Sequence, residues 1–99
     1  MAKQDVELQL MALENLKREL ENLIKDIETR TNNYTTCVQY LMQTNLDVNV
    51  AQQYKNQYWQ QDNVMLGQLH DRLKNYDLPY IERCITGARI ALASFKDKG

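Results

Sequence analysis

The sequence predicts an all-α fold, an elongated antiparallel helical hairpin formed by one domain of 99 residues. Apolar residues recur at every seventh position in the first part of the chain, which is typical of a helix with one apolar seam. These residues are Val6, Leu13, Leu20, Ile27, Tyr34 and Leu41. Glycine occurs 3 times and proline once, too rarely for an architecture of strands and turns. Because such a seam must be covered, a second helix is expected to pack on it.

The first helix is expected over residues 3–43. Leu16, Leu23 and Cys37 fill interleaved positions of the repeat, which places them on the same seam. Glu14 and Arg18 stand four residues apart in the order that supports a helix. Leu10, Ile24 and Val38 widen the apolar face on one side. We therefore assign this second set to a face that meets a partner.

A turn is expected over residues 44–48. Asparagine and aspartate side chains bond to the local backbone, which disfavours a helix interior and favours turns and caps. Asn45 or Asp47 is the expected N-cap of the next helix. Neither glycine nor proline marks the turn, so its position is defined only within a few residues.

The second helix is expected over residues 48–76. Its apolar seam includes Tyr54, Tyr58, Met65, Leu69, Leu73 and Tyr76. Gly67 weakens the middle of this helix by about 1 kcal/mol relative to alanine. This seam is the expected intramolecular cover of the first helix.

Pro79 interrupts the second arm, and a further helical segment is expected over residues 79–96. Proline disfavours a helical conformation in the preceding residue, yet it is favourable in a first helical turn. The arm therefore either kinks at Pro79 and continues, or breaks there and a third helix folds back. A kink is favoured, because residues 77–79 contain no glycine to close a reversal.

These elements divide the apolar residues into a hairpin core and a candidate partner interface. The expected core consists of Leu13, Leu16, Leu20, Leu23, Ile27, Tyr34, Leu41, Tyr54, Tyr58, Leu69 and Leu73. The expected partner interface consists of Leu10, Ile24, Val38, Tyr80, Ile81, Ile85, Leu92 and Phe95. Since one partner helix cannot bury both sets, we predict a homo- or heterodimer that forms a four-helix-type bundle.

Composition and motifs argue against an enzyme and against nucleic-acid binding. The net charge is -1 and no basic run is present, so a phosphate-binding surface is not expected. His70 is the only histidine, and no metal-ligand spacing or glycine-rich phosphate loop occurs. We expect no catalytic, cofactor-binding or metal-binding residue. Cys37 and Cys84 are expected to be small buried hydrophobes, with a disulfide between two antiparallel helices as the alternative.

No segment has the roughly 18 consecutive apolar residues of a membrane span. The first residues also lack the apolar stretch of a signal peptide. A cytoplasmic chain without a membrane span is expected, and signal-free secretion stays open.

Two arms of similar length around a short central turn, within about 100 residues, resemble the Trp-x-Gly (Esx-like) helical-hairpin superfamily of type VII secretion. Aligned on the turn, Leu46 stands at the family's Trp position and Val48 at its Gly position. Tyr54 and Tyr58 then match two aromatic positions of the family's second helix. The Trp-x-Gly residues are missing, and the C-terminal Tyr-x-x-x-Asp/Glu export signal is absent from the tail. The resemblance implies either a divergent member of the superfamily, or a helper that pairs with a larger secreted toxin and presents it to the secretion machine.

Three functions remain open from the sequence, all of them non-enzymatic protein binding. The first is an Esx-like partner or targeting chaperone for a secreted protein. The second is a small helical adaptor or inhibitor, of phage or plasmid type, that blocks another protein. The third is an architectural subunit of a homo-oligomer. Co-purification with a larger helical protein, inhibition of an unrelated enzyme and a defined homo-oligomer would distinguish them in that order.

Overall fold

The computed structural model describes residues 2–44 and 48–98, except for the side chains of residues 48 and 96–98. The first arm is the single helix α1 (Lys3–Thr44). The second arm is continuous and consists of α2 (Val48–Tyr54), the π-helical segment η1 (Lys55–Trp59), α3 (Gln60–Arg72), the π-helical segment η2 (Leu73–Asp77) and α4 (Leu78–Lys98).

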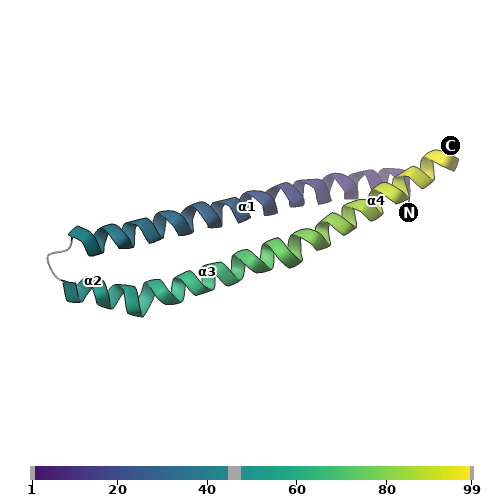
Figure 1. Ribbon diagram of the computed structural model, residues 1–99. Helices are drawn as coiled ribbons and strands as arrows, with labels where there is room; N and C mark the ends of the chain where they lie inside the picture. The colour runs from purple at the N-terminus through teal and green to yellow at the C-terminus, as the bar shows by residue number, and fades with distance from the viewer. Residues whose placement is uncertain (1, 45–47, 99) are drawn as a thin grey trace.

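The two arms run antiparallel and side by side, and both termini lie at the same end of the molecule (Figure 1). The principal-axis extents are 74 × 17 × 14 Å. The predicted all-α elongated hairpin is therefore confirmed. Most of the predicted turn, residues 45–47, lies outside the described residues, and the predicted dimer stays a prediction.

Helix α1 begins one residue after Ala2, whose carbonyl oxygen accepts hydrogen bonds from the amides of Asp5 and Val6 at 3.0 and 3.3 Å. Asp5 in the first turn places a negative charge near the positive end of the helix dipole. The helix then continues through Asn32 and Asn33 without interruption.

The second arm continues through Pro79 without a reversal, so no third helix folds back (Figure 1). Pro79 is the second residue of α4, where its missing amide hydrogen costs little. The π-helical segment η2 directly precedes α4, and the Leu78 amide donates to the Leu73 carbonyl five residues back. A regular α-helix would clash with the proline ring, and the wider π turn gives that ring space.

The seam between the arms contains seven buried apolar residues. They are Val6, Ile24 and Val38 on α1, and Ala51, Leu73, Ile85 and Ala88 on the second arm. On α1 the seam follows alternating steps of four and three residues and includes the half-buried Leu10, Leu13, Lys17, Leu20, Ile27, Thr31 and Tyr34. This spacing keeps one stripe facing the partner helix along the whole arm.

The structure corrects the expected division between core and partner face. Ile24 and Ile85, expected on the partner face, are 7% and 4% exposed and lie in the seam together with Val38. Several expected core residues are exposed instead. They are Leu16, Leu23, Leu41, Tyr58 and Leu69. On a helix, the residues three and four positions after Leu13 and Leu20 all lie close to these two leucines. The second arm covers the residues four positions on, Lys17 and Ile24, and leaves Leu16 and Leu23 exposed.

The remaining expected residues are mostly half-buried. Leu73 is buried in the seam as expected, and Tyr80 is exposed as expected of a partner face. Half-buried positions are held by the expected core residues Leu13, Leu20, Ile27, Tyr34 and Tyr54, and by the expected partner residues Leu10, Ile81, Leu92 and Phe95.

The π-helical segments keep the second arm in register with α1. Around η1 and again around η2, seam residues follow one another in consecutive steps of four, as in Leu73, Asp77, Ile81 and Ile85. An α-helix turns 3.6 residues per turn, so three such steps would rotate the seam away from the partner. A π turn absorbs the extra residue and returns the seam to the interface.

Candidate protein-binding flank

The hairpin has two flanks, the surfaces on either side of the seam where side chains of both arms meet. On α1, Leu16 and Leu23 lie on one side of the seam residues Leu20 and Ile24, because of the 3.6-residue periodicity. Glu14, Glu21 and Glu28 lie on the other side for the same reason. The two flanks therefore differ in chemistry along most of α1.

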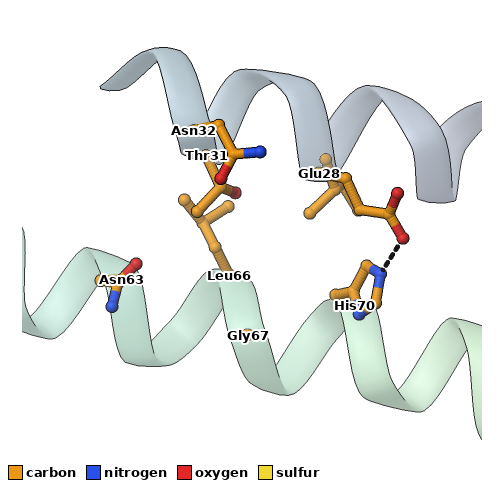
Figure 2. Close-up of a pocket in the computed structure, with 8 residues that line it drawn as sticks. Glu28, Thr31, Asn32, Asn63, Leu66, Gly67 and His70 are labelled. Atoms are coloured by element: carbon orange, nitrogen blue, oxygen red, sulfur yellow. Dashed lines mark hydrogen bonds and ion pairs between the residues drawn. The ribbon is translucent and has the colours of Figure 1, made fainter. Parts of the chain in front are cut away.

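We call the glutamate side the polar flank, and ion pairs between the arms bridge it. His70 Nε2 lies 2.7 Å from Glu28 Oε1, Lys17 Nζ lies 3.6 Å from Glu82 Oε2, and Arg89 Nη2 lies 3.4 Å from Glu14 Oε1. A hollow on this flank, lined by Glu28, Thr31, Asn32, Asn63, Gly67 and His70 among others, is shown in Figure 2. Three contacts between the arms thus pair part of the charge on this flank within the chain.

The Glu28–His70 contact also shifts both pKa values. The hydrogen bond to Glu28, and then that to Asp71, raise the pKa of His70 above its ordinary value of 6.5. The same hydrogen bond from His70 lowers the pKa of Glu28 below 4.5. Beside this pair, the Thr31 hydroxyl is buried with no hydrogen-bond partner among the described residues.

We call the opposite side the apolar flank, and large apolar side chains line it on both arms. It comprises Leu16, Leu23, Met65, Leu69, Tyr76 and Tyr80. Tyr76 is 73% exposed, Met65 65% and Leu16 45%. Three hollows run along this side. They are lined mainly by Tyr34, Asp62, Met65 and Leu69, by Leu16, Leu20, Tyr76 and Tyr80, and by Gln9, Leu13, Cys84 and Gly87.

A tyrosine cluster connects the two arms toward the hairpin tip. The Tyr34 hydroxyl donates to Asp62 Oδ2 at 3.0 Å, and it lies 2.7 Å from the Tyr54 hydroxyl. Because the single Tyr34 proton is directed to the carboxylate, Tyr54 donates to Tyr34. The hydrogen bond with Tyr54, burial and Asp62 raise the pKa of Tyr34 above its ordinary value. Tyr34 therefore remains a neutral donor that fixes the spacing of the arms.

The cysteines differ from the expectation that both are buried. Cys37 is exposed and Cys84 is half-buried, and both are free. Cys84 lines a hollow with Val6 and Leu13 near the open end, whereas Cys37 lies toward the tip, so the hairpin does not bring the two thiols together. Among the described residues, no group of three or more His, Cys, Asp and Glu side chains could hold a metal ion. Within the same residues, no helix is long and apolar enough to cross a membrane.

Sequence reasoning placed Met65 and Tyr76 on the seam of the second helix, and the structure places them on the apolar flank. A signal for this position is the run of seam residues spaced four apart around η2, Leu73, Asp77, Ile81 and Ile85. Such a run indicates that the seam of the second arm does not continue in heptads. On α1, the heptad of glutamates at Glu14, Glu21 and Glu28 marks the opposite flank.

Comparisons with protein-family models, with curated proteins and with solved structures found no match for this chain. The Esx-like resemblance therefore stays a prediction, and the functional argument depends on the two flanks alone.

Proposed function

We propose that this chain is a non-enzymatic protein–protein interaction module whose binding surface is the apolar flank. The observation that carries the proposal is the contrast between the flanks: cross-arm ion pairs bridge one, while exposed Leu, Met and Tyr side chains line the other. A row of large exposed apolar side chains along both arms is the kind of surface that marks association.

The composition of the apolar flank supports the same function. Tyrosine and methionine are enriched in interface cores, where charged residues are depleted. Tyr76, Tyr80 and Met65 provide both kinds of side chain, and each is more than half exposed. A partner helical hairpin laid along this flank would complete a four-helix-type bundle, because each arm would then contact two neighbours.

As the biological setting, we propose an Esx-like partner or targeting chaperone for a secreted protein. The support is the outline of the molecule, a two-armed hairpin with a short connection and both termini at one end. A small adaptor or inhibitor of another protein would use the same flank and is the alternative setting.

The proposal is tested by capture of partners from the native host, followed by mass spectrometry, with variants matched in chemistry. Leu23→Glu places a charge on the apolar flank, and Leu8→Glu makes the same change on the outer face. Leu8 lies two residues from both Val6 and Leu10, which turns it to the side opposite the seam. Both leucines are exposed, so both variants should fold.

We expect Leu23→Glu to lose the captured protein and Leu8→Glu to retain it. Capture of a larger helical protein supports the secretion setting, whereas capture of an enzyme that loses activity supports the inhibitor setting. Equal capture by the two variants would contradict binding through the apolar flank.

A further inference from the structure

We infer that the occupant of the apolar flank is a second copy of this chain, laid antiparallel so that the hairpin tips point in opposite directions. This inference rests on the proposed function and adds the identity and the register of the partner. Its basis is a stripe of residues on the second arm. When this stripe is laid against a reversed copy of itself, residues of complementary charge and shape face each other.

The stripe follows the apolar flank from η1 to α4. Its members are Tyr58, Asp62, Met65, Leu69, Tyr76, Tyr80, Arg83 and Gly87. Asp62, Met65 and Leu69 line one hollow of this flank, and Tyr76, Tyr80 and Arg83 line the next. Tyr58 stacks on Tyr54 at a centroid distance of 5.5 Å.

Reversal of the stripe about the point between Arg72 and Leu73 exchanges its members in pairs. The pairs are Asp62 with Arg83, Met65 with Tyr80, Leu69 with Tyr76, and Tyr58 with Gly87. In a two-fold dimer each pair would occur twice, because the same patch of each copy meets the other. An acid meets a base, two apolar side chains meet tyrosines, and the Tyr58 ring meets the residue without a side chain.

Within a single hairpin, the charged groups of these pairs can still bind a further partner, and the space beside Gly87 is empty. Arg83 forms no ion pair within the described part of the chain, and its guanidinium lies only over the Tyr80 ring, 5.8 Å from the centroid. Asp62 accepts one hydrogen bond, from Tyr34, which leaves acceptor capacity on its carboxylate. A Cβ built on Gly87 would meet no atom within 4 Å, so a ring has room there.

The first arm is compatible with the same two-fold axis. On the apolar flank of α1, reversal about the point between Asp26 and Ile27 exchanges Leu16 with Cys37 and Leu23 with Arg30. The Glu28–His70 contact at 2.7 Å joins residues next to the two midpoints, so both midpoints lie at nearly the same height along the hairpin. A single axis therefore serves both arms.

The surface area of the chain is sufficient for such a dimer. The hairpin exposes 7659 Å². A compact globular monomer of the same mass exposes about 5,900 Å², which leaves an excess of roughly 1,800 Å² per chain. A stable interface of standard size needs about 800 Å² from each partner.

The test reverses one charge at a time and then combines the variants. Asp62→Arg alone creates two Arg–Arg contacts in the dimer, and Arg83→Asp alone creates two Asp–Asp contacts. We expect each variant to self-associate at least about 10-fold more weakly than the parent, since like charges in an interface are strongly unfavourable. An equimolar mixture places an Arg against an Asp at both contacts. We expect it to form a heterodimer with near-parental affinity, measured by sedimentation velocity and native mass spectrometry.

A second pair of variants keeps the test valid if Asp62→Arg disturbs the Tyr34 contact and does not fold. In a chain with Cys37→Ser and Cys84→Ala, Met65→Cys in one copy should link to Tyr80→Cys in another through a short bismaleimide. Neither cysteine variant alone should link, because identical positions lie far from the axis. Cross-linking in the mixture of the two cysteine variants, but in neither variant alone, would support this register.

The inference is overturned if the charge-reversed variants dimerise as tightly as the parent, or if folded variants stay monomeric when mixed. A parent chain that remains monomeric while Leu23→Glu still loses a captured protein would also overturn it. That last outcome would leave the proposed binding function intact, so the two proposals fail by different results.

Discussion

At the residue scale, two polar clusters set the distance between the arms. His70 joins α3 to Glu28 of α1, and Tyr34 joins α1 to Tyr54 and Asp62 of the second arm. The apolar seam contains no side chain under 2% exposed, so these directional contacts add specificity to a loosely covered interface.

The Glu28–His70 contact predicts a stability that depends on pH. Because the pKa of His70 is raised from 6.5, its contribution is complete below that pH and is lost as the pH rises through the folded value. Because the pKa of Glu28 is lowered from 4.5, its contribution is lost as the pH falls through the folded value. The contact should therefore stabilise most between about pH 4.5 and 6.5.

Thermal unfolding followed by circular dichroism, at fixed protein concentration, checks this dependence. Glu28→Gln should flatten the fall in Tm as the pH rises above about 6.5, because the hydrogen bond that raises the pKa of His70 is removed. Glu19→Gln, a change at an exposed residue without an ion pair among the described residues, should keep it. An unchanged pH profile in Glu28→Gln would exclude the contact as the cause.

Tyr34→Phe should destabilise the hairpin by about 1–2 kcal/mol, because two hydrogen bonds between the arms are lost. The matched control is Tyr40→Phe on the same helix, since Tyr40 is 66% exposed, and it should change stability by less than about 0.5 kcal/mol. Urea unfolding measures both. Equal stability of the two variants would show that the cluster contributes nothing.

At the element scale, the π-helical segments explain why the second arm departs from the heptads that its sequence suggests. The heptad of α1 predicted the helix and its length correctly, because Val6, Leu13 and Leu20 lie on the seam in either reading. The heptad did not reveal toward which side of Leu13 and Leu20 the covered seam extends. Leu16 and Leu23 are more apolar than Lys17 and Thr31, yet the structure covers the latter. Lys17 fits because its ammonium reaches Glu82 while its aliphatic part is half-buried.

Deletion of single residues tests the role of η2. In a chain with Pro79→Ala, which removes the ring that would clash with a regular α turn, removal of Asn75 should convert η2 to such a turn and keep Ile85 and Ala88 facing α1, because a π turn holds one extra residue. Removal of Gln68, an exposed residue of α3, should rotate all later residues by about 100° and expose Leu73 and Ile85.

Each fully buried side chain of this size contributes about 1.5–3 kcal/mol, so the Gln68 deletion should lose cooperative unfolding. The Asn75 deletion should retain it. Far-UV circular dichroism with thermal melts measures both. A Gln68 deletion as stable as the Asn75 deletion would show that the register of the second arm is not fixed by the seam.

At the scale of the whole molecule, the shape follows from two long arms and a short connection. The all-α hairpin could be predicted from the rarity of glycine and proline and from the α1 heptad. The candidate site could be predicted only as a surplus of apolar residues. The exposure of Tyr80 agrees with the prediction, and its contact with a partner stays a prediction. The exposure of Met65 and Tyr76 depends on the π turns, whose effect on register is not visible in a regular helical repeat.

Small-angle scattering checks the shape. The radius of gyration is 21.5 Å for the Cα atoms. A compact chain of this length would give about 13 Å. At a concentration where the chain is monomeric, we expect a value near that of the hairpin. A value close to the compact one would contradict the elongated hairpin.

The polar flank has a consequence for how far an assembly of these chains can grow. A hairpin with two apolar flanks would offer a fresh surface after every addition, and copies would stack without end. Here each copy has one such surface, and its other side presents charged groups bridged by ion pairs such as Arg89–Glu14. In the inferred dimer, growth would therefore stop after one addition, which favours a closed pair over a fibre.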